Sequence, residues 1–167
     1  MDSNQIKSLH DLLEKLRLGK IEGTVEIRIT TKGKVSTVFV KSKENTHEHP
    51  EAEITHRIIE LQQERPELKA DFSHLEVQAD APGLDFHESN FSYTRLLESN
   101  LPYAHFNGAP FYKAIISQSN ISHASGLNMD GAYLTGSVNL YNAHSMIPDI
   151  VNPLDAHFHA HEHGGMY

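Results

Sequence analysis

The chain of 167 residues is long enough for one domain or two very small ones, and its hydrophobic content of 38% is compatible with a folded protein. Cysteine is absent, which excludes disulfide bonds and thiol chemistry. The net charge is −8, and residues 1–83, 84–142 and 143–167 contribute −3, −2 and −3 of it. No segment is basic, so direct binding to nucleic acid is not expected.

The sequence also allows a prediction of the protein's location in the cell. No apolar run approaches the roughly 18 residues of a membrane-spanning helix, so no membrane span is expected. Residues 1–5 are polar and lack the basic-then-apolar pattern of a secretory signal. Together with the absence of cysteine, these features predict a cytoplasmic protein, or one exported without a classical signal peptide.

The first third of the chain predicts a helix followed by a β-hairpin. Apolar residues at helical spacing indicate a helix that begins near Ser3 and stops near Gly19. Residues 25–29 alternate between apolar and polar side chains, and residues 35–40 are rich in β-branched side chains. Residues 31–34 supply the turn between these two strands.

A second helix is predicted from Pro50 to about Gln63. Proline suits the first helical turn, and Ile54, Ile58 and Leu61 would share one buried face. Residues 1–66 would then form a small α+β helix–hairpin–helix unit. A two-stranded sheet of this size buries little apolar surface by itself. The unit is therefore predicted to cap the rest of the chain or to mediate oligomerisation.

From about residue 70, apolar residues recur at every fifth position, a spacing that fits neither a helix nor an ordinary strand. The residue two places before each apolar centre is almost always Ala, Ser or Thr, and Asp or Asn often stands between the two. The predicted centres are Phe86, Phe91, Leu96, Leu101, Phe106, Phe111, Ile116 and Ile121, with Phe72 upstream and Leu134 downstream.

This pattern resembles the pentapeptide-repeat family, over about residues 70–142. The units 89–93, 99–103 and 119–123 match it closely. The resemblance implies a mainly β fold, a short right-handed quadrilateral β-helix over residues 67–144. Four repeats would make one turn of this solenoid, so residues twenty apart would stack. Residues 145–167 would then hold a C-terminal cap and a His-rich tail.

Two groups of side chains are candidates for binding. Tyr93, Tyr103 and Tyr112 occupy variable, outward positions of their repeats, where exposed tyrosine favours contact with a protein partner. Alternating imidazoles in the tail offer ligands for zinc, nickel or copper, although a solvated tail with adventitious affinity is the simpler interpretation. These metal candidates are His157, His159, His161 and His163.

The sequence contains no nucleophile elbow, phosphate loop or dinucleotide fingerprint, so no enzyme activity and no cofactor are expected. The leading hypothesis is a non-catalytic interaction module that forms a homodimer and docks a protein partner. The resemblance implies a bacterial setting, as an effector or regulator. A DNA-mimicking modulator of DNA gyrase is the first alternative, disfavoured because residues 84–142 carry a net charge of only −2. A metal-binding protein is the second.

Overall fold

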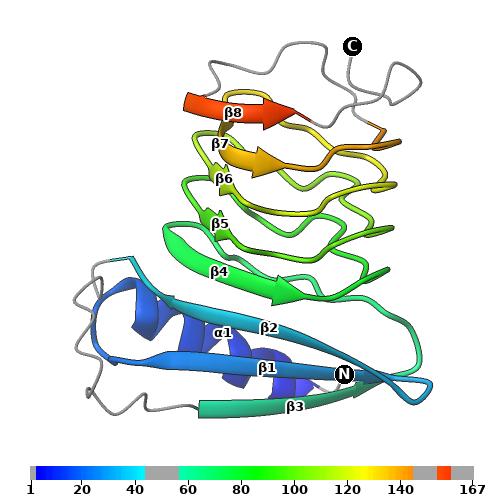
Figure 1. Ribbon diagram of the computed structural model, residues 1–167. Coiled ribbons are helices and arrows are strands. Elements are labelled where there is room, and N and C mark those ends of the chain that lie inside the picture. The colour runs from blue at the N-terminus through cyan, green and yellow to red at the C-terminus, as the bar shows by residue number, and fades with distance from the viewer. Residues whose placement is uncertain (1–2, 44–56, 145–153, 159–167) are drawn as a thin grey trace.

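The computed structural model describes residues 3–43, 57–144 and 154–158, which form one helix and a mixed eight-stranded sheet (Figure 1). The sheet order is β3-β1-β2-β4-β5-β6-β7-β8. Among the described residues, no helix is long and apolar enough to cross a membrane. The elements are α1 (Ser3–Arg17), β1 (Thr24–Thr31), β2 (Lys34–Ser42), β3 (Arg57–Gln63), β4 (Leu75–Asp80), β5 (Arg95–Leu97), β6 (Ile115–Ser117), β7 (Tyr133–Val138) and β8 (Leu154–Phe158).

The predicted helix and hairpin are both confirmed. Helix α1 ends at Arg17, and Gly19 follows in a left-handed conformation with φ of 70°. Strands β1 and β2 pair antiparallel through a two-residue turn at Lys32 and Gly33. Both turn residues have positive φ, 49° and 80°, which is the conformation of the turns that match the twist of a tight hairpin.

The predicted second helix, and with it the helix–hairpin–helix unit, is wrong. Residues 57–63 form strand β3, which pairs in parallel with β1. Leu61 is buried in this strand while Ile58 is 48% exposed, so the two do not share a buried face. A short apolar run fits a strand as well as a helix, and here the open edge of β1 offers backbone groups for pairing. Residues 44–56, where the helix was predicted to begin, lie outside the described part of the chain.

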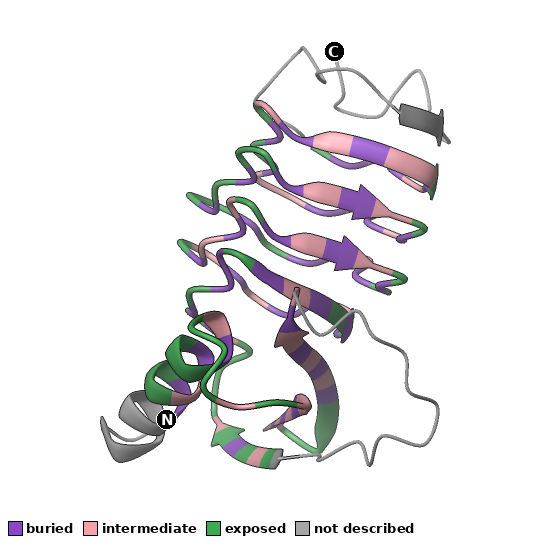
Figure 2. Cartoon of the chain, turned by 90° about the vertical axis from the view of Figure 1, so that its left-hand side faces the viewer, coloured by how far each residue is buried: buried purple, intermediate pink, exposed green. Residues whose placement is uncertain are grey.

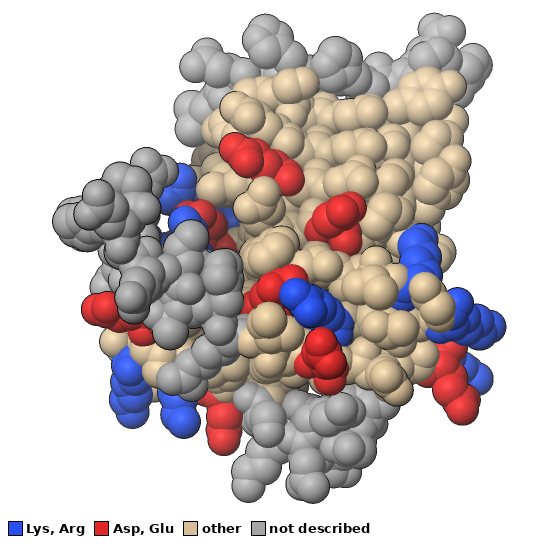
Figure 3. Space-filling view, turned by 60° about the horizontal axis from the view of Figure 1, so that its bottom comes forward, with Lys and Arg blue, Asp and Glu red and all other residues tan. Residues whose placement is uncertain are grey.

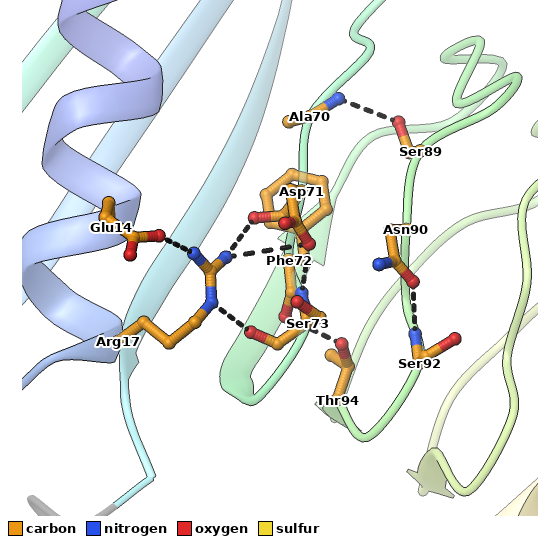
Figure 4. A network of polar contacts seen from close by, with 10 residues as sticks. All are labelled: Glu14, Arg17, Ala70, Asp71, Phe72, Ser73, Ser89, Asn90, Ser92 and Thr94. Carbon is orange, nitrogen blue, oxygen red and sulfur yellow. Dashed lines mark hydrogen bonds and ion pairs between the residues drawn. The ribbon is translucent and has the colours of Figure 1, made fainter.

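The N-terminal unit continues the sheet of the repeats directly. Strand β2 pairs antiparallel with β4, and α1 lies against one face of the hairpin (Figure 1). The Arg17 side chain then joins the helix to the first repeat (Figure 4). Its Nε donates to the carbonyl oxygen of Ser73 and its Nη2 to that of Asp71, both at 2.7 Å. These bonds satisfy carbonyl groups that the first turn of the repeats presents to α1.

From β4 to β7 the chain winds in successive turns that lie one above the other (Figure 1). The strands β4 to β7 pair in parallel, and Arg95 lies beside Ile115, twenty residues further along. Single bridges join other sides of the turns at the same spacing, such as Asn100 with Asn120. Backbone hydrogen bonds therefore run from turn to turn along the whole stack.

Phenylalanine rings form two columns in the interior of the turns, beside columns of leucine and isoleucine. Phe91 stacks on Phe111 at a centroid distance of 4.8 Å, and Phe86 on Phe106 at 5.4 Å, which confirms the twenty-residue stacking. Phe72 extends the first of these columns, with its ring 5.2 Å from that of Phe91. Buried positions alternate with mostly half-buried ones along the strands (Figure 2), and one core runs from α1 to the last described turn.

Small polar residues have a bonding role inside the stack. The buried hydroxyl of Ser89 donates to the carbonyl of Leu68 and accepts from the amide of Ala70, as Figure 4 shows in part. Ser99 and Ser119 each accept a backbone N–H bond from the preceding turn in the same way. Because a buried hydroxyl must be paired, this geometry explains Ser at positions where size alone would allow Ala.

Candidate interaction surface

Each repeat turns a corner through the same local structure. In several repeats an Asp or Asn before the buried centre accepts a hydrogen bond from the amide two residues later, as Asn90 does from Ser92 at 2.9 Å (Figure 4). The second residue after the centre then has positive φ. At most corners this residue has a side chain, although left-handed backbone is unfavourable for all residues except glycine. The corner residues with side chains are His74, Glu88, Tyr93, Glu98, Tyr103, Lys113, Gln118, His123 and Asn142.

One line of corners carries a row of rings, here called the Tyr93 edge and defined as His74, Tyr93, Tyr112 and Lys113. The His74 and Tyr93 rings stack at 4.7 Å with an interplanar angle of 8°. Tyr112 meets Tyr93 edge-on at 5.9 Å, and the Lys113 ammonium lies 5.9 Å from the centre of the Tyr112 ring. Tyr112 packs closely over Gly131, where a Cβ would lie 2.8 Å from its ring.

A second line of corners forms the Tyr103 edge, defined as Tyr103, His123 and Tyr141. Tyr103 stacks on His123 at 4.6 Å with an interplanar angle of 7°, and His123 meets Tyr141 edge-on at 5.5 Å. Tyr93 and Tyr103 are ten residues apart, which is half of a twenty-residue turn. The two edges therefore lie on opposite sides of the stack.

The tyrosine rings on both edges are exposed but held in place. Tyr93 is 40%, Tyr112 50% and Tyr103 60% exposed, the last being the most exposed large apolar residue described. Their backbones are fixed by hydrogen bonds between turns, such as Tyr93 N to Tyr112 O at 2.8 Å. A ring that is already ordered loses little conformational entropy when a partner covers it.

Charge is distributed unevenly over the surface. Figure 3 shows acidic and basic side chains gathered over the end of the molecule that holds α1 and β3, while the repeat strands above present mostly uncharged surface. Residues 84–144 carry four acidic and two basic side chains. Such a surface lacks the dense negative charge that a mimic of DNA requires.

The structure places the residues selected from the sequence as follows. All ten proposed repeat centres are buried, each no more than 1% exposed. Of the metal candidates, His157 lies in strand β8, and His159, His161 and His163 lie outside the described residues. Within the described part of the chain, no group of three or more His, Asp or Glu side chains is arranged to hold a metal ion. The proposed cap at residues 145–153 also lies outside it.

Reasoning from the sequence missed the ring partners of the tyrosines. His74 and His123 were not among the candidates chosen from the sequence, yet each stacks on a tyrosine of a neighbouring turn. The available signal was the spacing, because His74 precedes Tyr93 by nineteen residues and His123 follows Tyr103 by twenty. Residues at about one turn's separation occupy the same column.

The comparison with known families agrees with this geometry. Residues 83–118 match the family model "Pentapeptide repeats", in eight copies. No curated protein and no solved structure matches the chain. Residues 83–118, and with them the central turns of the stack, are therefore pentapeptide repeats.

Proposed function

We propose that the protein is a non-catalytic interaction module that presents its two tyrosine edges to a protein partner. The scaffold in this proposal is a short right-handed quadrilateral β-helix over residues 67–144, capped at its N-terminal end by residues 1–66. The observation that carries the proposal is the set of exposed tyrosines ordered by stacking at strained corners. Tyrosine in this state offers a partner both apolar area and a hydroxyl group.

Strain at these corners supports the proposal. A glycine would adopt the same backbone more easily, and glycine does occupy other corners of the stack, at Gly83 and Gly108. At Tyr93 and Tyr103 the chain instead keeps a large aromatic side chain in a left-handed conformation. Residues held in such conformations often serve a function.

The proposal also covers the type of organism, the cellular location and the oligomeric state. The family resemblance suggests a bacterial effector or regulator, which acts in the cytoplasm or is exported without a classical signal, and which forms a homodimer. A modulator of DNA gyrase ranks below this, because the repeats carry few acidic residues. A metal-dependent role for the tail histidines has no support from the described residues.

Photo-crosslinking tests the docking role directly. Tyr93 and Tyr103 would each be replaced by benzoyl-phenylalanine, an aromatic analogue that can keep the ring stack, in the cells from which the gene derives. The matched controls carry the same analogue at Glu98 and Gln118, which are exposed left-handed corners on another side of the stack. Irradiation should give discrete adducts from the tyrosine positions only.

The mass of a crosslinked adduct shows what kind of partner occupies the tyrosine edges. An adduct of about twice the chain mass would identify a second copy of the chain as the occupant, and a different mass would identify another protein. The proposal is wrong if irradiation gives no adduct at either tyrosine position, or if the Glu98 and Gln118 variants give the same adducts in the same yield.

A further inference from the structure

The basic residues of the repeats gather beside one of the two edges. Downstream of residue 84 the chain has only two basic side chains, Arg95 and Lys113. Lys113 belongs to the Tyr93 edge, and Arg95 follows Tyr93 by two residues at the start of β5. Strand β2 and its end add Lys41 and Lys43 from the N-terminal unit to the same surface.

Two of these four cations lie close to one carboxylate, that of Glu76. Lys41 Nζ lies 3.1 Å from Glu76, and Arg95 Nη1 lies 3.7 Å from the same carboxylate. The Glu76 side chain is only 14% exposed, so it lies beneath the cations rather than in solvent. The cluster therefore carries an excess of positive charge on a protein whose net charge is −8.

Two observations indicate that this positive charge is not fully compensated. Arg95 Nε is buried, and among the described residues no acceptor forms a hydrogen bond with it. Burial, and then the positive charge of Arg95, lower the pKa of Lys43. A buried donor without an acceptor and a cation repelled by its neighbour are both stabilised when an anion approaches.

Apolar surface lies next to the cations. Ile115 pairs with Arg95 across β5 and β6, and Tyr133 pairs with Ile115 on β7. All three alternate with buried residues, so their side chains point to the outer face of the sheet. The surface thus offers cations, exposed tyrosine rings and an aliphatic side chain in adjacent positions.

We infer that the Tyr93 edge, together with Lys41, Lys43 and Arg95, binds an acidic peptide segment of the partner in which carboxylates alternate with apolar side chains. The inference rests on the proposed function and names the chemistry of its partner. Carboxylates would lie against the cations, while apolar side chains would cover Tyr112 and Ile115. A single-stranded nucleic acid fits less well, because His74 and Tyr112 already occupy much of the Tyr93 ring surface that a base would need.

The test measures fluorescence anisotropy with a labelled peptide of alternating glutamate and phenylalanine, about twelve residues long and roughly 40 Å when extended. We expect it to bind the full chain at least about tenfold more tightly than a peptide with lysine in place of glutamate. Raising the salt from about 0.05 M to about 0.5 M should weaken the binding, because exposed charges are then screened.

Charge variants inside and outside the proposed site test whether the peptide binds there. Lys113→Glu and Lys43→Gln should each weaken binding by roughly fivefold or more, since each removes a cation. Lys20→Glu makes the same charge change as Lys113→Glu, on an exposed residue of the N-terminal unit, and should leave binding unchanged. Lys113 is exposed and does not contact Glu76 in the structure described, so its variant should remain folded, as its melting temperature would verify.

The outcomes separate the inference from the proposed function. Equal binding of both peptides, or equal affinity of the Lys113→Glu and Lys20→Glu variants, overturns the inference. So does tighter binding of an oligothymidylate of the same length. If the inference is overturned but crosslinks still form at Tyr93 or Tyr103, the protein is still an interaction module, and its partner is not an acidic peptide. If no crosslink forms at either position, the proposed function itself fails.

Discussion

Two glycines with left-handed backbone show how one missing atom can decide local packing. Gly126 has φ of 69°, and a Cβ built there would lie 1.8 Å from Oδ1 and 2.9 Å from Cα of Asn107. Gly83 has nearly the same φ, 74°, but a Cβ there would meet only Lys34 Nζ, at 3.8 Å. Both glycines thus have a left-handed backbone, and only Gly126 also lacks the space for a Cβ atom.

Replacement of these glycines by alanine should separate the two requirements. Both variants place alanine in a left-handed conformation, which costs on the order of 1–2 kcal/mol. Gly126→Ala should lose about 1–3 kcal/mol more than Gly83→Ala, because the Asn107 backbone would have to move. Urea denaturation of both variants measures the difference. Equal losses would show that Asn107 does not lie against Gly126.

At the scale of elements, the Arg17 side chain forms hydrogen bonds between α1 and the first repeat. The Arg17 side chain is 17% exposed and reaches two backbone carbonyls of the first repeat, at Asp71 and Ser73. Its Nη1 also contacts Glu14 of the same helix, which orients the guanidinium group. A planar group with several donors can bond two carbonyls at once, whereas the ammonium of lysine acts as a single point.

Arg17→Lys should therefore destabilise the protein, although the charge is kept. The loss of hydrogen bonds from a charged donor to two carbonyls, of which the bond to Ser73 is partly buried, predicts a decrease of about 1–3 kcal/mol in the free energy of unfolding. Lys15→Ala, which changes an exposed residue of the same helix, is the control and should have a much smaller effect. If both variants unfold at the same urea concentration, Arg17 does not hold the joint.

At the scale of the whole molecule, β3 lies at one end of the sheet order, with one side paired to β1. Among the described strands, none pairs with its other side. Ile58 in this strand is 48% exposed. An open edge with an exposed apolar residue favours association between copies, and symmetric dimers are the commonest closed assembly.

Light scattering of the full chain should therefore give about twice the chain mass of 18.8 kDa. Ile58→Lys should shift the protein toward the monomer, because a lysine on an edge strand opposes pairing with another strand. Val35→Lys is the matched control, since Val35 is 56% exposed but lies beside the hairpin turn. A monomer at high concentration, or dissociation by both variants alike, would refute dimerisation through β3.

What the sequence determined by itself is the repeat. The five-residue period specified which residues fill the interior, and the twenty-residue turn specified that Phe91 would stack on Phe111. Both follow from local chemistry that recurs along the repeats: an apolar centre, a small neighbour and, in several units, an Asp or Asn that shapes the turn. The helix α1 and the β1–β2 hairpin were predictable for the same reason, since each depends on contacts close in sequence.

Tertiary structure alone decided the rest. Residues 57–63 became a strand because β1, about thirty residues earlier, offered an edge to pair with. The stacking of His74 on Tyr93, and the gathering of Lys41 and Arg95 around Glu76, also bring together residues from different turns and strands. A local pattern can indicate that a side chain is exposed. Which other side chains lie beside it on the surface depends on how the turns and the N-terminal strands align, and that alignment is set by hydrogen bonds between segments far apart in the chain.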